Sequence, residues 1–361
     1  MSDQMMAEPT EAFLQQKDGS GWRNIFYSAE NLLITLALAM MMVLPLAEIV
    51  LRKFFHTGIS GSTSFVQHLT LMVGMLGGAI AARENRLLSF AALETFLKGR
   101  WKTIIKIFCG SVATAITVFL CVASIQFVQS EKAIPVPKIL AYSIPYWAIE
   151  TIMPIGFAAV ALRIIYHASE NWRGRGLTIL LAGLLIWMGV YPPLPSGHLL
   201  IPAFILLLIA AILGIPIFAT LGGTALIFFW GNNEPIASIP IDHLALATNS
   251  SLPTVPLFIL AGYFLAEGGA SKRLIRVFQA LFGQFRGGPA IVTALVCAFF
   301  TTFTGGSGVT ILALGGLLLP VLLAARYSER DALGLLTGAG SLGLLFPPCL
   351  PLILYAIIAK I

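Results

Sequence analysis

The sequence predicts an all-α integral membrane protein, a multi-span helical bundle that contains a re-entrant hairpin and a broken helix. Three observations lead to this class. The 361 residues are 58% hydrophobic and only 11% charged, whereas an average soluble domain carries about 25% charged residues. Apolar runs of membrane-spanning length follow one another along the chain. Two later apolar runs are interrupted by glycine and proline. A soluble enzyme, a disordered chain and a nucleic-acid-binding protein are therefore disfavoured.

The first part of the chain contains a polar stretch and four predicted spans. Residues 1–27 lack the basic start and apolar centre of a secretory signal, so we expect a cytoplasmic tail. A transmembrane helix needs about 20 apolar residues, and this predicts spans at Leu32–Leu51, Phe65–Ala82, Ile104–Val128 and Tyr146–Tyr166. The Arg83–Lys102 stretch mixes basic and apolar residues, which fits a helix in the headgroup plane or a solvated loop.

The composition changes near residues 170–195. A fifth span, Leu177–Tyr191, precedes the break Pro192-Pro193-Leu194-Pro195. The apolar segments that follow are shorter and richer in glycine and proline: Leu199–Leu213, Ile217–Trp230, Val255–Ala266, Ala290–Phe303, Val309–Ala325 and Ala332–Ala359. We therefore expect a tail (1–27), a four-helix scaffold domain (28–170), a linking transmembrane helix (171–195) and a second module (196–361).

The distribution of basic residues predicts the orientation. If the N-terminus is cytoplasmic, the outer side receives Arg52, Lys53, Lys132 and Lys138; Lys360 is unassigned, and the rest of the 22 Lys and Arg residues fall on the inner side. This asymmetry follows the positive-inside rule. It accounts for the pI near 9.2 without nucleic acid as a partner. It also requires Ala290–Phe303 and Val309–Ala325 to enter and leave on the same side.

These two short segments meet at a glycine-rich tip, Thr304-Gly305-Gly306-Ser307-Gly308. Each glycine inside a helix costs about 1 kcal/mol relative to alanine, so the tip favours a break. Irregular backbone at membrane depth is tolerated where it is buried in protein or lines a cavity. A re-entrant hairpin satisfies this condition, and a tight helix crossing through small residues is the alternative.

A second break follows within one apolar run. Gly338-Ala339-Gly340-Ser341-Leu342-Gly343 is followed by Phe346-Pro347-Pro348-Cys349-Leu350-Pro351. Prolines remove backbone donors and fix φ, so we expect the helix to unwind here; a kinked structural helix is the alternative. Two interrupted apolar segments are the usual indication of a transporter binding site.

Other polar residues carry less information. Glu48 lies four residues before Arg52, where a local ion pair at the headgroup level accounts for it. Glu150 lies beside Trp147 near a span end, where interfacial anchoring accounts for both. The four cysteines and five histidines are dispersed, and no catalytic motif appears in a workable context. We therefore expect neither an enzyme nor a bound cofactor.

Several motifs resemble a known transporter family. Leu257-Phe258-Ile259-Leu260-Ala261-Gly262, Arg286-Gly287-Gly288, the Gly305–Gly308 tip and Gly343–Pro351 occur in this order. Together they resemble the large membrane subunit of the tripartite ATP-independent periplasmic (TRAP) transporters. Residues 28–167 resemble the small subunit through Val50-Leu51-Arg52-Lys53-Phe54-Phe55, Gly77-Gly78-Ala79, Ala82-Arg83-Glu84 and Pro154-Ile155-Gly156-Phe157. Residues 177–191 resemble the helix that joins the two in fused versions.

The resemblance implies a multi-pass protein of the bacterial inner membrane that imports organic anions, such as dicarboxylates or sugar acids, with sodium. It implies a periplasmic substrate-binding protein as partner, a small subunit that acts as scaffold, and an elevator-type large subunit built from two inverted repeats. Residues Gly305–Thr310 would form the first hairpin tip, and Gly338–Pro348 the unwound helix facing it. Ser307, Pro347 and Pro348 would contact the substrate.

The two breaks predict a sodium site where they meet. Its ligands would come from the tip and the second break: Gly305, Gly306, Ser307, Gly308, Thr310, Gly340 and Ser341. Carbonyl and hydroxyl oxygens without full charge suit a monovalent cation. No acidic residue lies in either motif, so we expect no metal beyond sodium.

The chain departs from the family pattern in two ways. Ile311-Leu312-Ala313-Leu314 after the tip is apolar where the family has polar or acidic residues, and the last residue, Ile361, comes soon after the first broken helix. We expect the remaining half of the transport domain to come from elsewhere. The alternatives are another elevator-type anion carrier that needs no binding protein, and a membrane scaffold without transport.

Overall fold

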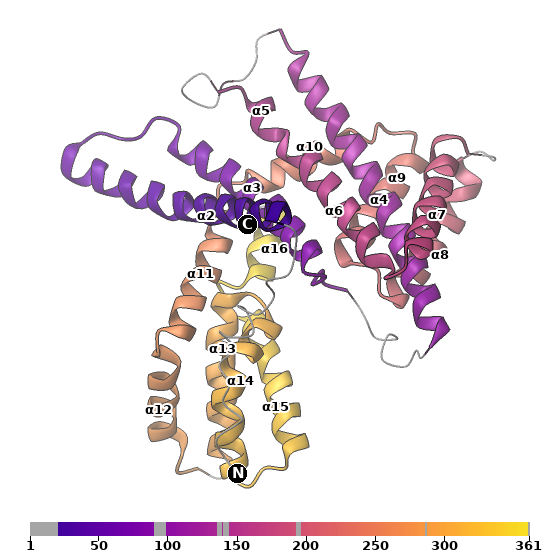
Figure 1. Cartoon of the computed structure of the whole chain (residues 1–361). Coiled ribbons are helices and arrows are strands. Elements are labelled where there is room, and N and C mark those ends of the chain that lie inside the picture. The colour runs from indigo at the N-terminus through magenta and orange to yellow at the C-terminus, as the bar shows by residue number, and fades with distance from the viewer. Residues whose placement is uncertain are drawn as a thin grey trace.

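The computed structural model describes residues 21–89, 99–135, 139, 144–192, 196–285 and 287–359. Within these ranges the chain is helical and contains no strand (Figure 1). The first helices are α2 (Gly21–Phe55), α3 (Ser62–Arg83), α4 (Arg100–Lys132), α5 (Tyr146–Glu150), α6 (Ile152–Ala168) and α7 (Trp172–Val190). They are followed by α8 (Ser196–Leu213), α9 (Ile217–Gly231), α10 (Ser238–Ala247), α11 (Thr254–Glu267) and α12 (Ala270–Phe282). The last are α13 (Gly288–Thr304), α14 (Ser307–Ala324), α15 (Glu329–Leu342), the 3₁₀ turn η1 (Gly343–Leu345) and α16 (Leu350–Ala359).

The helix lengths confirm an all-α, multi-span membrane protein. In the described residues, six helices are long and apolar enough to cross a membrane, or seven if the bent pair α11–α12 counts as one span. The five spans expected before residue 192 correspond to α2, α3, α4, α5 with α6, and α7. Helix α2 begins at Gly21, within the expected tail of residues 1–27, and residues 1–20 of that tail lie outside the described residues. Residues 90–98 of the expected headgroup-plane stretch lie outside the described residues.

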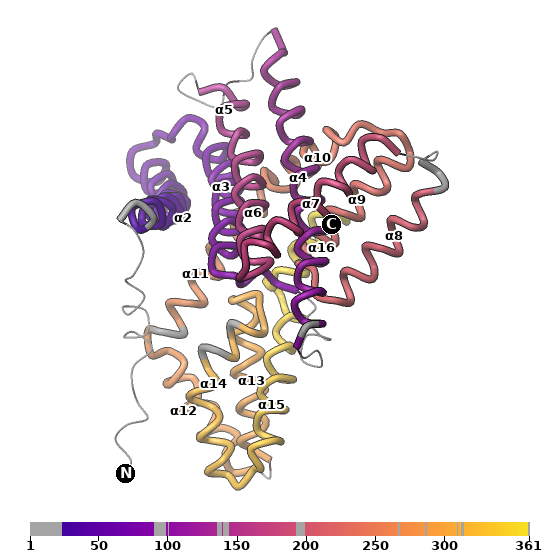
Figure 2. Tube along the Cα trace, turned by 45° about the vertical axis from the view of Figure 1, so that its right-hand side comes forward, coloured from indigo at the N-terminus to yellow at the C-terminus, as the bar shows by residue number. Residues whose placement is uncertain are grey.

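Helix α4 is the centre of the N-terminal part. It packs against α6, α7, α8, α9 and α10, and a core of small and branched side chains fills the space between these helices. The pair α8–α9 follows the composition change in sequence and still packs on α4 (Figure 2). Helices from both sides of the change therefore share one hydrophobic core.

Helices α11 to α15 form a second bundle below this part in Figure 1, and α16 extends from it toward α2 and α3. Helix α13 contacts α11, α12, α14 and α15. Its apolar side chains, among them Val292, Val296 and Phe300, are buried against Leu314, Leu318 and Leu336 of the neighbouring helices. Helices α11 and α12 meet at a bend of 72°. This bundle contains both interrupted segments predicted from the sequence.

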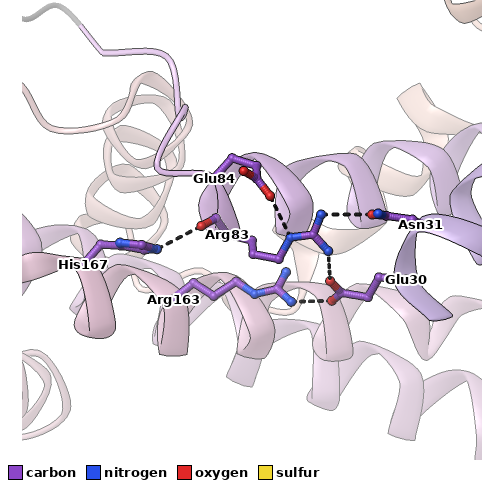
Figure 3. Close-up of polar contacts among 6 residues, drawn as sticks. All are labelled: Glu30, Asn31, Arg83, Glu84, Arg163 and His167. Atoms are coloured by element: carbon purple, nitrogen blue, oxygen red, sulfur yellow. Dashed lines mark hydrogen bonds and ion pairs between the residues drawn. The ribbon is translucent and has the colours of Figure 1, made fainter. Parts of the chain in front are cut away.

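An ion network ties α2, α3 and α6 together near the start of α2 (Figure 3). The carboxylate of Glu30 accepts hydrogen bonds from Arg163 on α6 and from Arg83 at the end of α3, the latter at 3.0 Å. Arg83 also donates to Glu84 at 3.0 Å and to Asn31 at 2.9 Å. The side chains of Glu30, Arg83 and Arg163 are 11%, 9% and 14% exposed, so the network is largely shielded from solvent.

The sequence leads to a separate prediction for each of two glutamates, Glu48 and Glu150. The ion pair of Glu48 with Arg52 is confirmed, with 2.5 Å between Oε1 and Nη2. The side chain of Glu150 is buried at the end of α5, and Thr151 alone separates it from α6. The interfacial anchoring of Glu150 and Trp147 stays a prediction.

Candidate functional site

Helices α13 and α14 form a hairpin around the predicted glycine tip. They pack side by side and are joined by only two residues, Gly305 and Gly306. Gly305 ends α13 with a left-handed φ of 69°, and its N–H donates to the carbonyl of Thr301 at 2.9 Å. Such a helix end favours glycine because a Cβ would be strained there. The tip is shorter than the five residues expected, because Ser307 and Gly308 already belong to α14.

The helix that follows is broken, as the prolines predict, but over a shorter stretch than expected. Gly338 to Leu342 remain helical in α15, and the interruption runs from η1 to the start of α16 at Leu350. Glycine inside a helix is tolerated at about 1 kcal/mol, whereas proline lacks the N–H that the helix needs. The expectation that Gly338–Pro348 is unwound is therefore wrong for its first five residues.

Buried threonine hydroxyls connect the hairpin to the broken helix. The hydroxyl of Thr301 donates to the carbonyl of Gly340 at 2.9 Å and lies 2.8 Å from the hydroxyl of Thr310. The hydroxyl of Thr304 also lies 2.8 Å from that of Thr310. Thr301 and Thr310 are fully buried, and Thr304 nearly so. We call Thr301, Thr304, Thr310 and the Gly340 carbonyl the threonine cluster.

Close backbone packing holds the cluster together. A Cβ on Gly343 would lie 2.3 Å from the carbonyl oxygen of Ala298 and 2.7 Å from the amide nitrogen of Thr302. A Cβ on Gly340 would lie 3.0 Å from Ile311 Cγ1. The Thr302 hydroxyl donates to its own helix at Ala298 and lies 3.4 Å from the Gly343 carbonyl. Glycine is therefore needed at position 343, where η1 touches α13, and it is favoured at position 340, where α15 lies close to α14.

The residues proposed from the sequence divide into three groups. Thr310 and the carbonyl of Gly340 lie in the threonine cluster, and Gly306 adjoins it, since its carbonyl lies 3.4 Å from the Thr310 hydroxyl. Gly305 and Ser307 lie half-buried at the tip. Gly308, Ser341 and Pro347 are exposed, and Pro348 is half-buried; the geometry does not bring these four into the cluster.

The sequence reasoning missed Thr301 and Thr304. Both precede the glycines of the tip, and Thr301 bonds to Gly340, 39 residues further along the chain. Their spacing of three residues places them on one face of α13. A hydroxyl pair with this spacing in the last turn before the glycine tip is the signal that indicates them.

The chemistry of this site is that of neutral oxygen atoms. Its ligand atoms are hydroxyls and carbonyls from the ends of α13 and α15 and the start of α14. Within the described part of the chain, no three His, Cys, Asp or Glu side chains gather as a metal site. The arrangement can hold a weakly coordinated cation, and it contains no nucleophile with an adjacent base.

Two protein-family models match the chain. Residues 41–174 match the DctQ component, and residues 200–361 the DctM component, of the tripartite ATP-independent periplasmic transporters. The two matches follow in the order and at the places that the sequence motifs predicted.

Curated relatives agree with these matches. The C4-dicarboxylate TRAP transporter large permease protein DctM of Vibrio cholerae is 36% identical over 155 residues, 42% of this chain and 34% of that protein. The isethionate TRAP transporter permease protein DctMQ of Oleidesulfovibrio alaskensis is 27% identical over 228 residues, 61% of this chain and 35% of that protein. The ectoine TRAP transporter large permease protein TeaC of Halomonas elongata is 32% identical over 151 residues, 41% of this chain and 35% of that protein. The chain spans about a third of the length of these relatives.

Proposed function

Because this chain belongs to the tripartite ATP-independent periplasmic transporter family, with a DctQ part and a DctM part in one polypeptide, we propose the following function. The chain is the membrane component of a sodium-driven importer of organic anions. It lies in the bacterial inner membrane with its N-terminus in the cytoplasm, and it receives substrate from a periplasmic substrate-binding protein. Its DctM part moves as an elevator against the DctQ scaffold.

The threonine cluster is the observation that carries sodium coupling. Helices α13 and α15 end beside it, and the carbonyl end of a helix carries partial negative charge that favours a cation. Unwound backbone and half-helix ends coordinate sodium in transporters of this general design. Neutral oxygens suit a monovalent ion, because they do not offset the desolvation of a divalent one. The proposed ligands are the hydroxyls of Thr301, Thr304 and Thr310 with the carbonyls of Gly306 and Gly340.

The proposed substrate class is based on the N-terminal ends of two helices, α14 and α16. Helix α14 starts at Ser307 and α16 at Leu350, beyond Pro347 and Pro348. A Cβ placed on Gly305 would lie 3.3 Å from Leu350 Cβ, so the two helix starts are neighbours. Helix N-termini carry partial positive charge and attract anions. The relatives named for C4-dicarboxylate and isethionate support an organic acid as substrate.

The proposed elevator needs a second hairpin and a second broken helix. The resemblance assigns them to further large-subunit sequence, and we propose that such sequence completes the transport domain.

The proposed coupling mechanism rests on a difference in sodium affinity between two conformations of the transport domain. Ion binding at the threonine cluster favours the conformation in which α13, α14 and α15 are closed on one another, and it shifts the equilibrium by its preference for that state.

Uptake by the complete transporter tests this proposal. The assay follows a labelled dicarboxylate into proteoliposomes with the binding protein present, under a sodium or a potassium gradient. Thr310→Val should raise the sodium concentration for half-maximal uptake several-fold, whereas Thr310→Ser retains the hydroxyl and should stay near wild type. Thr337→Val is the matched control, because the exposed Thr337 hydroxyl bonds only to its own helix at Leu333, at 2.7 Å.

Three outcomes count against parts of the proposal. Equal uptake in potassium and sodium rejects sodium coupling. An unchanged sodium dependence in Thr310→Val rejects the threonine cluster as the ion site. Full uptake without the binding protein favours the alternative carrier that needs none.

A further inference from the structure

A polar cavity lies at the end of the N-terminal part that carries the ion network. It has a volume of about 220 Å³ and lies between α3, α4, α6 and the link from α8 to α9. Its walls include Lys102, Lys106, Arg163, His167, Asn85 and Ser89. A water molecule occupies about 30 Å³ in the liquid, so the cavity has room for a small polar group.

Among the described residues that line the cavity, Lys102, Lys106 and Arg163 are basic and none is acidic. Glu30 and Glu84, which pair with Arg83 and Arg163 in the ion network, are not among the lining residues. Two positive and two negative charges therefore balance around Arg83 and Arg163. Lys106 adds positive charge on the cavity wall, and no carboxylate partner of Lys106 is seen in the described residues.

Arg163, one of the residues that line the cavity, carries an unsatisfied donor. One terminal nitrogen, Nη2, donates to Glu30, as Figure 3 shows. The other, Nη1, is buried and has no hydrogen-bond partner among the described residues. Buried polar groups are rarely left without a partner. Lys102 and Lys106 are exposed, so the cavity has an open, lysine-lined side, and it also borders Arg163, whose side chain is largely buried.

The aromatic residues around the cavity place it at the level of lipid headgroups. Trp101 at the start of α4, Tyr166 near the end of α6 and Trp172 at the start of α7 are exposed. The guanidinium of Arg175 lies over the Tyr166 ring, 4.1 Å from its centroid. Exposed tryptophan and tyrosine with flanking arginine and lysine are typical of the membrane interface. Basic pockets between helices at this level accept phosphate-bearing headgroups.

We propose that this cavity binds a phosphate group, contributed by the phosphodiester of an anionic phospholipid or by a soluble phosphate ester. Lysine binds phosphate as a point charge, and arginine donates to its oxygens through more than one N–H. The cavity wall includes the link between α8 and α9, where Ile217 N–H donates to the carbonyl of Leu88 at 2.8 Å. A phosphate held here bridges the DctQ and DctM parts. The proposal does not depend on sodium coupling.

Binding and thermal stability of the purified full chain test the proposal. In the first series, the protein is placed in phosphatidylcholine nanodiscs that contain an increasing fraction of phosphatidylglycerol. In the second series, the protein is in pure phosphatidylcholine nanodiscs and the concentration of inorganic phosphate is increased. A phosphodiester ligand should raise the apparent melting temperature saturably in the first series alone. A soluble phosphate ligand should raise it in the second.

Three variants distinguish specific binding in the cavity from a general effect of positive surface charge. Lys106→Gln should weaken the saturable effect about tenfold, since a hydrogen bond between charged groups is lost, and Lys106→Arg should restore it. Lys272→Gln on α12 removes an exposed lysine outside the cavity and should change nothing. Arg163 is left intact, because it pairs with Glu30. The proposal is overturned if neither series saturates, or if Lys106→Gln and Lys272→Gln behave alike.

Discussion

The hydroxyl of Thr301 donates a hydrogen bond of 2.9 Å to the carbonyl oxygen of Gly340, 39 residues further along the chain. This bond links the last turn of α13 to the end of α15, just before the helix breaks. It places the hairpin tip and the broken helix, which the sequence identifies separately, in one buried polar contact. Glycine at position 340 also lets α15 lie close to α14, because a Cβ there would lie 3.0 Å from Ile311 Cγ1.

Replacement of Thr301 by valine should destabilise the DctM part. Valine has nearly the same shape but leaves the Gly340 carbonyl without its donor. Hydrogen bonds between helices in membranes contribute about 0.6–2 kcal/mol, so the apparent melting temperature of the purified protein should fall by a few degrees. Thr301→Ser keeps the hydroxyl and should lie closer to wild type. If Thr301→Val melts at or above the wild-type temperature, the bond does not stabilise the fold.

Replacement of Gly343 by alanine should be far more damaging than replacement of Gly338. A Cβ at 343 would overlap the Ala298 carbonyl oxygen and the Thr302 amide, whereas a Cβ at 338 would meet nothing within 4 Å. Overpacking against backbone costs about 1–3 kcal/mol or more. Gly338→Ala should be neutral or up to about 1 kcal/mol stabilising, because alanine favours helix. The folded yield of each variant after size-exclusion chromatography compares them, and equal yields would mean that the contact of η1 with α13 is not tight.

The parts of the fold that the sequence predicts are those with local signals. Long apolar runs identify α2, α3 and α4, and Pro347 and Pro348 place the break before α16. The extent of the break was misjudged, because glycine within a helix is only mildly unfavourable. Of the two predicted hydroxyls near the tip, Ser307 lies outside the threonine cluster, and Thr310 lies in it with Thr301 and Thr304, which were not predicted.

The contacts that depend on tertiary packing are not visible in the sequence. Glu30 lies 53 residues from Arg83 and 133 from Arg163, and no local pattern relates these charges. The threonine cluster likewise needs α13 and α15 to pack together before its hydroxyls meet. Sequence reasoning identifies elements by their period and composition, but it does not give the partner of an isolated polar side chain.

The expected orientation predicts which loops a membrane-impermeant thiol reagent can reach. In a cysteine-free background, Arg86→Cys after α3 and Arg276→Cys on α12 should be unreactive from outside intact cells and reactive in inverted vesicles. Lys132→Cys at the end of α4 should show the opposite pattern. Their positions follow from the positive-inside rule. Labelling of position 86 or 276 from the periplasm would reverse the assignment.

The α13–α14 hairpin should enter and leave the membrane on one side. Helix α13 has 17 residues, which at 1.5 Å per residue gives about 25 Å, less than the roughly 30 Å of a hydrocarbon core. A reporter enzyme active only in the periplasm, fused after Gly306, should therefore be inactive, while the same fusion after Lys132 should be active. High activity of the Gly306 fusion would indicate two full spans.

Replacement of Glu30 by glutamine should destabilise the DctQ part much more than replacement of Glu84. Glu30 pairs with both Arg83 and Arg163 and is 11% exposed, whereas Glu84 pairs with Arg83 alone and is 52% exposed. Removal of one partner from a buried ion pair costs about 3–5 kcal/mol, because the remaining charge is left uncompensated, while an exposed pair contributes about 0–1 kcal/mol. The apparent melting temperature and the detergent-solubilised yield should fall sharply for Glu30→Gln and little for Glu84→Gln. Glu30→Asp, which keeps the charge on a shorter side chain, should lie between them. A Glu30→Gln protein as stable as Glu84→Gln would mean that water or lipid, rather than Glu30, compensates the two arginines.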